Sequence, residues 1–98
     1  MVTAELHAIA RKMVARNKGI LAADESNATM SKRLESINVV SAPESRRQWR
    51  QLLFQTQGIG DFISGVIMYD ETIRQSDDSG KRFVELLAMR DILSGIKV

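Results

Sequence analysis

The sequence lacks the residues that build covalent cross-links and most metal centres. Among its 98 residues there is no cysteine, and there is one histidine, His7. The lack of cysteine excludes a disulfide framework and any thiolate metal ligand. One histidine is far too few for a zinc site built on imidazole ligands. We therefore expect no metal site built on thiolate or imidazole ligands.

The chain also lacks a strong charge of one sign and a long apolar run. Its formal net charge of +2 is too small to indicate, by itself, binding to nucleic acid or to a membrane surface. No apolar run approaches the length of a membrane span, and charges throughout residues 1–17 are unlike a signal peptide. We expect a cytoplasmic protein that binds neither nucleic acid nor membranes and forms at most one small domain.

Helical and strand patterns alternate along the sequence. A continuous apolar run at 19–23 is typical of a strand buried on both faces of a parallel sheet, and 63–69 and 95–98 give two further strand patterns. Apolar spacings of three and four residues predict helices over 3–17, 26–37, 42–57 and 83–90. This order predicts an α/β fold with a parallel sheet. Because the third strand has only begun at the last residue, we expect the opening portion of a larger α/β protein.

Local signals set the expected helix ends. Thr3 is suited to cap the first helix, and Asn17 or Gly19 is suited to the left-handed conformation that stops it. Ser41 and Glu44 form the capping-box pattern S-x-x-E, with a proline in the first turn of the helix that follows.

The motif RRQWR places basic residues around an aromatic side chain, a combination that also occurs in nucleic-acid-binding proteins. Trp49, however, shares a helical stripe with Leu52 and Leu53, which favours a position in the core. We therefore expect the arginines of this motif on a solvated face of the helix, together with Glu44.

A charged residue lies at or near the carboxyl end of each of the three predicted strands. Asp24, Asp70 and Lys97 fall at or near the carboxyl ends of the strands, where parallel α/β folds bind ligands. Two acids and one amine would share this rim if the strands are adjacent. The alternative is that each charge only marks the place where a strand meets water.

Hydroxyl and basic residues follow Asp24 at the start of a predicted helix: Ser26, Thr29, Lys32 and Arg33. Amides at a helix N-terminus, together with hydroxyls and cations, can bind an anion such as a phosphate group. The alternative is a capped, solvated helix in which Ser26 is the N-cap and the two cations form an exposed face. The pattern alone leaves both open.

Five ordered blocks of the sequence resemble class I fructose-bisphosphate aldolases. The first is KGILAADES (18–26), and the others are SKRLESI (31–37), RRQWRQLLF (46–54), ISGVIMYDETIRQ (63–75) and GIKV (95–98). Together they cover nearly the whole chain in the order and spacing of the family.

The resemblance implies a (β/α)8 barrel, of which residues 1–98 would form the N-terminal part of a single domain, with 1–17 as a helix that precedes the first strand. It implies reversible cleavage of fructose 1,6-bisphosphate into dihydroxyacetone phosphate and glyceraldehyde 3-phosphate. The reaction would proceed through a lysine Schiff base without a metal. The family is typically a cytosolic homotetramer, and its Schiff-base lysine and acid/base glutamate would lie on strands beyond this chain.

The resemblance also assigns roles to residues of this chain. Asp24 would position the substrate hydroxyls and support proton transfer, and Lys97 would contact the substrate and its distal phosphate. Ser26 and Thr29 would bind the same phosphate. Arg33 would be a substrate-phosphate residue, and Arg46 a more distant one.

One departure from the family pattern lies in this phosphate loop. Asn27 and Ala28 stand where threonine and glycine are common, and loss of the glycine is expected to stiffen the loop with a modest effect on affinity.

Two other interpretations of the sequence are a truncated, non-catalytic aldolase-like fragment and a small phosphate-binding α/β protein with different chemistry.

Overall fold

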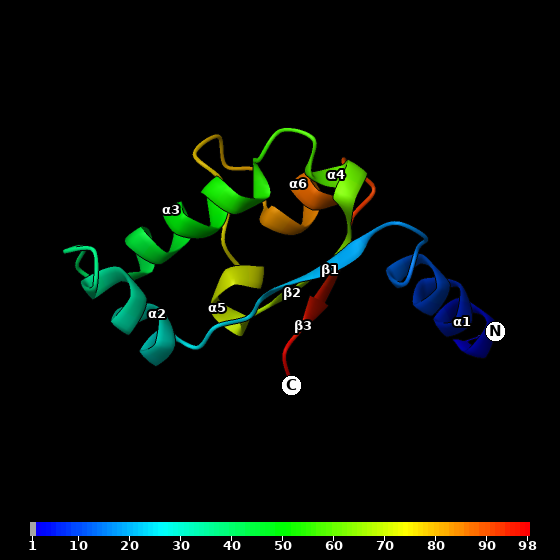
Figure 1. Cartoon of the computed structure of the whole chain (residues 1–98), viewed down its shortest axis with the longest axis horizontal. Coiled ribbons are helices and arrows are strands. Elements are labelled where there is room, and N and C mark those ends of the chain that lie inside the picture. The colour runs from blue at the N-terminus through cyan, green and yellow to red at the C-terminus, as the bar shows by residue number, and fades with distance from the viewer. Residues whose placement is uncertain (1) are drawn as a thin grey trace.

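A parallel three-stranded sheet forms the centre of the protein (Figure 1). The computed structural model describes residues 2–98, and its strands are β1 (Gly19–Ala23), β2 (Ile63–Met68) and β3 (Leu93–Ile96). Their order in the sheet is the order in the sequence, so β2 is central and pairs in parallel with both neighbours. The α/β fold with a parallel sheet is confirmed.

Helices connect the strands and precede the first of them. They are α1 (Val2–Met13), α2 (Asn27–Glu35), α3 (Pro43–Phe54), α4 (Ile59–Phe62), α5 (Asp70–Ile73) and α6 (Phe83–Ala88). The short helices α4 and α5 flank β2 and were not predicted, because a single turn carries too little periodicity to be recognised. Among residues 2–98, no helix is long and apolar enough to cross a membrane.

The hydrophobic core lies where α3 and α6 meet the sheet. The rings of Phe54 and Phe83 contact each other edge to face, with centroids 5.2 Å apart. Both rings are fully buried, as are Val66 and Met68 of the central strand and Leu87 of α6. Burial of these side chains holds one face of β2 and β3 against the helices.

The first strand is less buried than its sequence predicts. Only Ala23 of β1 is buried, and Ile20 is 43% exposed. The expectation of a strand buried on both faces is therefore wrong for this chain. β1 lies at one edge of the sheet, whereas α4 and α6 pack on β2 and β3.

The ends of α1 and α3 differ from the predicted ones. The described part of the chain is already helical at Val2, so Thr3 lies in the first turn and is not the cap. Asn17 has the predicted left-handed conformation, with φ +64°. α3 begins after Ala42, not after Ser41, because a proline at the first helical position requires an extended residue before it.

The buried face of α3 is also different from the predicted one. Arg46, Arg50 and Phe54 face inward at four-residue spacing, whereas Leu52 is 66% exposed. The prediction that the arginines form a solvated face is wrong for Arg46 and Arg50. Trp49 is half-buried.

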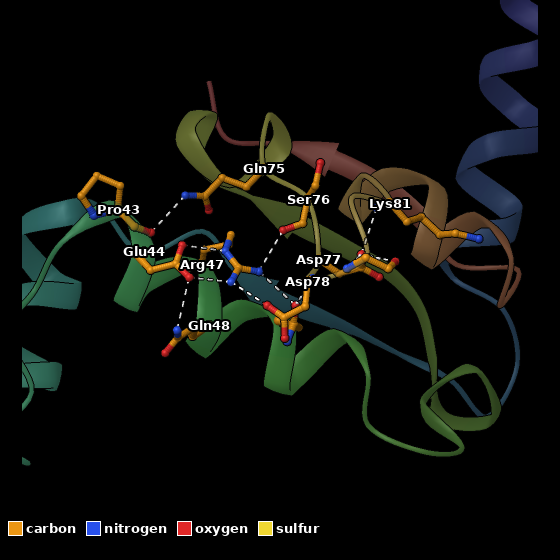
Figure 2. A network of polar contacts seen from close by, with 11 residues as sticks. Pro43, Glu44, Arg47, Gln48, Gln75, Ser76, Asp77, Asp78 and Lys81 are labelled. Atoms are coloured by element: carbon orange, nitrogen blue, oxygen red, sulfur yellow. Dashed lines mark hydrogen bonds and ion pairs between the residues drawn. The ribbon is translucent and has the colours of Figure 1, made fainter.

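Arg47, on the neighbouring side of α3, joins the helix to the polar segment around residues 76–81 (Figure 2). Its Nη2 donates to Glu44 Oε1 at 2.6 Å and to Asp78 Oδ1 at 2.7 Å. Gln51 adds a bond from Nε2 to Asp78 Oδ2 at 2.9 Å. Hydrogen bonds from Gln51 and Arg47 lower the pKa of Asp78, and that from Arg47 lowers the pKa of Glu44. The network fastens this loop to α3.

Candidate functional site

The three strands end at one level, which defines the rim of the candidate site. Ala23 pairs with Met68, and Met68 pairs with Ile96. The backbone amide of Lys97 continues the ladder by donating to Met68 O at 2.9 Å. Asp24 and Lys97 therefore both leave the sheet at its carboxyl edge, on either side of the end of β2.

Asp24 and Lys97 face each other across this rim. Lys97 Nζ lies 3.9 Å from Asp24 Oδ2 and 3.5 Å from Asp24 O. The side chain of Lys97 is 48% exposed and that of Asp24 is 29% exposed, so both remain open to a ligand. A carboxylate and an ammonium at this separation can bind hydroxyl and phosphate groups of one small molecule.

Asp70, the third charge predicted at this rim, makes a separate pair. It opens α5, and its Oδ1 accepts hydrogen bonds from Arg74 at 3.0 and 3.2 Å. Both side chains are well exposed. The structure thus brings together one acid and one amine of the predicted three charges.

The N-terminus of α2 follows Asp24 directly and presents two hydroxyl groups. Ser26 is the N-cap, as the alternative of a capped helix had it: its Oγ accepts from the Thr29 backbone amide at 3.3 Å and donates to Thr29 Oγ1 at 3.2 Å. The first turn of α2 contains no acidic residue. Two hydroxyls at a helix N-terminus whose first turn carries no carboxylate form an arrangement suited to an anion.

Ala28 lies in the first turn of the same helix. Alanine is the best helix former, so its backbone conformation here is unstrained. Asn27 is the first residue of α2, and its Oδ1 is buried. A glycine is therefore not required at position 28 for the fold of this loop.

Arg33 and Arg46 occupy different environments. Arg33, at 59% exposure, forms an ion pair with Glu25 in the β1–α2 loop. Arg46 is buried and donates to both carboxylate oxygens of Glu71, from Nε at 2.7 Å and from Nη2 at 2.9 Å. Its Nη1 donates to Ser41 Oγ at 2.9 Å. Arg33 thus lies beside the candidate site, and the donors of Arg46 are engaged inside the protein.

Glu25 lies at this site and Arg50 lies directly behind it, and reasoning from the sequence missed both. Glu25 contacts Arg33 through one carboxylate oxygen and Arg50 through the other. Arg50 also donates from Nη2 to the backbone oxygen of Glu25 at 2.9 Å. The available signal was the four-residue spacing of Arg46, Arg50 and Phe54, which places both arginines on the face of a core phenylalanine.

No group of three or more histidine or acidic side chains that could hold a metal ion occurs in the part of the chain that the structure describes.

Comparison with known proteins identifies the family. Residues 5–98 match the family model of the glycolytic class-I fructose-bisphosphate aldolases. The chain is 51% identical over 94 residues to fructose-bisphosphate aldolase 2 of Caenorhabditis elegans, covering 96% of this chain and 26% of the relative. It is 48% identical over 94 residues to the chloroplastic fructose-bisphosphate aldolase 1 of Chlamydomonas reinhardtii, covering 96% and 25%.

A solved structure has the same fold. The fructose-bisphosphate aldolase of Plasmodium falciparum, solved in complex with TRAP and a small-molecule inhibitor, superposes with a TM-score of 0.95 at 46% identity. The match covers 99% of this chain and 28% of that structure. The chain therefore spans about a quarter of the length of these curated relatives. Its parallel strands and helices are the N-terminal part of a (β/α)8 barrel, and the chain belongs to the class I fructose-bisphosphate aldolase family.

Proposed function

We propose that residues 1–98 supply one side of an aldolase active site that cleaves fructose 1,6-bisphosphate reversibly into dihydroxyacetone phosphate and glyceraldehyde 3-phosphate. The observation that carries the proposal is the position of Asp24 opposite Lys97, with Ser26 and Thr29 on the adjoining helix N-terminus. A carboxylate, an ammonium and an anion site on one rim match a substrate that carries both hydroxyls and phosphates.

Each group has a distinct role in this proposal. Asp24 orients the substrate hydroxyls and supports proton transfer as the carbon–carbon bond breaks. Lys97, Ser26 and Thr29 bind the phosphate distal to the reacting carbonyl. Arg33 adds positive charge near that phosphate, and Arg46 acts at a distance because Glu71 and Ser41 already engage its donors.

The covalent step requires a further group. We assign the Schiff-base lysine to a segment beyond residues 1–98, because Lys97 belongs to the phosphate side of the rim. The 98-residue chain alone is accordingly expected to be inactive, and no metal or other cofactor enters the reaction. For the longer protein we propose a cytoplasmic homotetramer that binds neither nucleic acid nor membranes.

A chimera tests this proposal. The 98-residue chain replaces the matching segment of the C. elegans aldolase, which supplies the rest of the barrel. The chimera should cleave fructose 1,6-bisphosphate, and borohydride should trap dihydroxyacetone phosphate on it. The separate 98-residue chain should do neither. A folded chimera without cleavage would contradict the proposal, and so would turnover by the 98-residue chain.

The same trapping experiment addresses the second candidate, a small phosphate-binding α/β protein. The Ser26–Thr29 helix N-terminus favours that candidate because it would suit any phosphate ester. In the chimera the trapped lysine would come from the C. elegans segment, so this comparison uses the longer protein that contains residues 1–98. Phosphate binding by that protein without borohydride labelling would support the binder, whereas labelling would support the aldolase.

A further inference from the structure

Arg50 lies behind the candidate site rather than in it. Its side chain is fully buried in the middle of α3. Nη2 donates to the backbone oxygen of Glu25 at 2.9 Å and lies 3.4 Å from Glu25 Oε1. Within residues 2–98, Nε and Nη1 have no hydrogen-bond partner. The polar contacts of this buried cation are thus directed at one residue of the β1–α2 loop.

Core packing does not explain an arginine at this position. Removing a guanidinium from water is costly, and burial lowers the pKa of Arg50 while the charge of Glu25 opposes that shift. An aliphatic side chain of similar volume would fill the same space on the face that also carries Phe54 without this penalty. The arginine therefore points to a requirement for its hydrogen bond to the loop.

The accepting carbonyl lies between the two parts of the candidate site. Glu25 stands between Asp24 at the end of β1 and Ser26 at the N-cap of α2. In a planar trans peptide the carbonyl and the following N–H point in opposite directions. A bond from α3 to the Glu25 carbonyl therefore fixes the orientation of the Ser26 amide, which points away from α3.

A second charge pair supports this arrangement. Arg46, one turn before Arg50, is held in a two-bond pair with Glu71 at the start of α5. Glu71 adds a favourable charge interaction for Arg50, whereas Arg46 opposes it. Helix α3 is thereby fixed against α5, next to the end of β2, and it carries Arg50 at a defined distance from the loop.

From these contacts we propose that Arg50 is a positioning residue that holds the Glu25–Ser26 peptide so that Ser26 and Thr29 are aligned for the distal phosphate of the substrate. The inference rests on the proposed aldolase function. It predicts a selective effect: a substrate with the distal phosphate depends on Arg50, and one without it does not.

The test compares two substrates in the chimera. Fructose 1,6-bisphosphate carries the distal phosphate and fructose 1-phosphate lacks it. Arg50→Met should raise KM for the bisphosphate about tenfold and leave KM for fructose 1-phosphate within about twofold. Arg50→Lys should give an intermediate increase, because an ammonium can reach one carbonyl but lacks the planar fork of a guanidinium.

Arg47→Met is the matched control, since Arg47 lies on the same helix but contacts Glu44 and Asp78. It should leave the ratio of the two KM values unchanged. An equal change for both substrates in Arg50→Met, or no change in either, would overturn the inference; if that variant does not fold, the same ratio in Arg50→Lys decides. Lack of cleavage by the unmutated chimera would instead contradict the proposed function, so the two failures are distinguishable.

Discussion

Lys97 extends its ammonium group past the end of the central strand to within 3.9 Å of Asp24 Oδ2. Both side chains keep much of their surface exposed. An ion pair of this kind contributes only about 0–1 kcal/mol to stability. Its importance lies in the two opposite charges that it holds at the open rim of a parallel sheet, where a polar ligand can engage both.

Asp24→Asn tests the proposed role of the carboxylate. In the chimera it should lower kcat for fructose 1,6-bisphosphate by about 100-fold or more, the range that a positioned acid/base group contributes. Asp70→Asn is the matched control, because Asp70 follows the neighbouring strand but pairs with Arg74. Steady-state kinetics should show the control within about twofold of the unmutated chimera. Equal losses in both variants would remove Asp24 from the reaction.

Thr29 tests the anion site at the start of α2. Thr29→Ser keeps the hydroxyl and should retain affinity, whereas Thr29→Val keeps the shape and should raise KM for the bisphosphate by about fivefold to tenfold. The side chain of Thr29 accepts from Ser26 Oγ and does not cap the helix itself. Thermal unfolding should therefore change little in either variant. An unchanged KM in Thr29→Val would argue for a simple capped helix.

Glu71 is expected to make stability depend on pH. The hydrogen bonds from Arg46 lower the pKa of Glu71 from its ordinary value of 4.5. A carboxyl group with a lower pKa in the folded than in the unfolded chain contributes stability that is fully present above 4.5. That contribution is lost as the pH falls through the folded pKa.

Urea unfolding of the chimera at neutral and acidic pH measures this contribution. Glu71→Gln should lower the free energy of unfolding at neutral pH by about 2 kcal/mol, since it leaves Arg46 without its charged partner. It should also narrow the difference in stability between the two pH values. Arg46→Met should narrow it in the same way. A pH dependence that persists undiminished in both variants would contradict the assignment.

Gly60 tests the packing of α4 against the end of α6. A Cβ at this position would lie 2.7 Å from the backbone oxygen of Arg90, so the backbone has to move. Gly60→Ala should therefore destabilise the protein by about 1–3 kcal/mol, although alanine is normally favoured in helices. Gly19→Ala, where a Cβ meets no atom within 4 Å, is the control and should change stability by about 0.5 kcal/mol or less. Equal losses of unfolding free energy in the two variants of the chimera, measured with denaturant, would contradict a close contact between Gly60 and the backbone of Arg90.

The strands and the Ser26 cap could be predicted because their signals are local. An apolar run bounded by breakers predicted β1 with its exact bounds, whereas the third strand lies two residues earlier at both ends than the predicted 95–98. The burial of Arg46 and Arg50 could not be predicted in this way. Their partners, Glu71 and Glu25, each lie 25 residues away in the sequence, and no helical periodicity encodes such contacts.

The same distinction between local signals and contacts far apart in the sequence holds for the candidate site. The rule that ligands bind at the carboxyl ends of parallel strands placed Asp24 and Lys97 at one rim. It also placed Asp70 there, but in the structure Asp70 pairs with Arg74, the residue that caps the end of α5. Glu25 was not predicted as a site residue because its contacts depend on α3, which approaches the loop only in the folded chain.

The most direct test of the central claim is a crystal structure of the chimera with fructose 1,6-bisphosphate bound. The account predicts that the phosphate distal to the reacting carbonyl lies within hydrogen-bonding distance of Ser26 Oγ, Thr29 Oγ1 and Lys97 Nζ, with a substrate hydroxyl against Asp24. A bisphosphate bound with neither phosphate at the N-terminus of α2, or with no contact to Asp24, would contradict it.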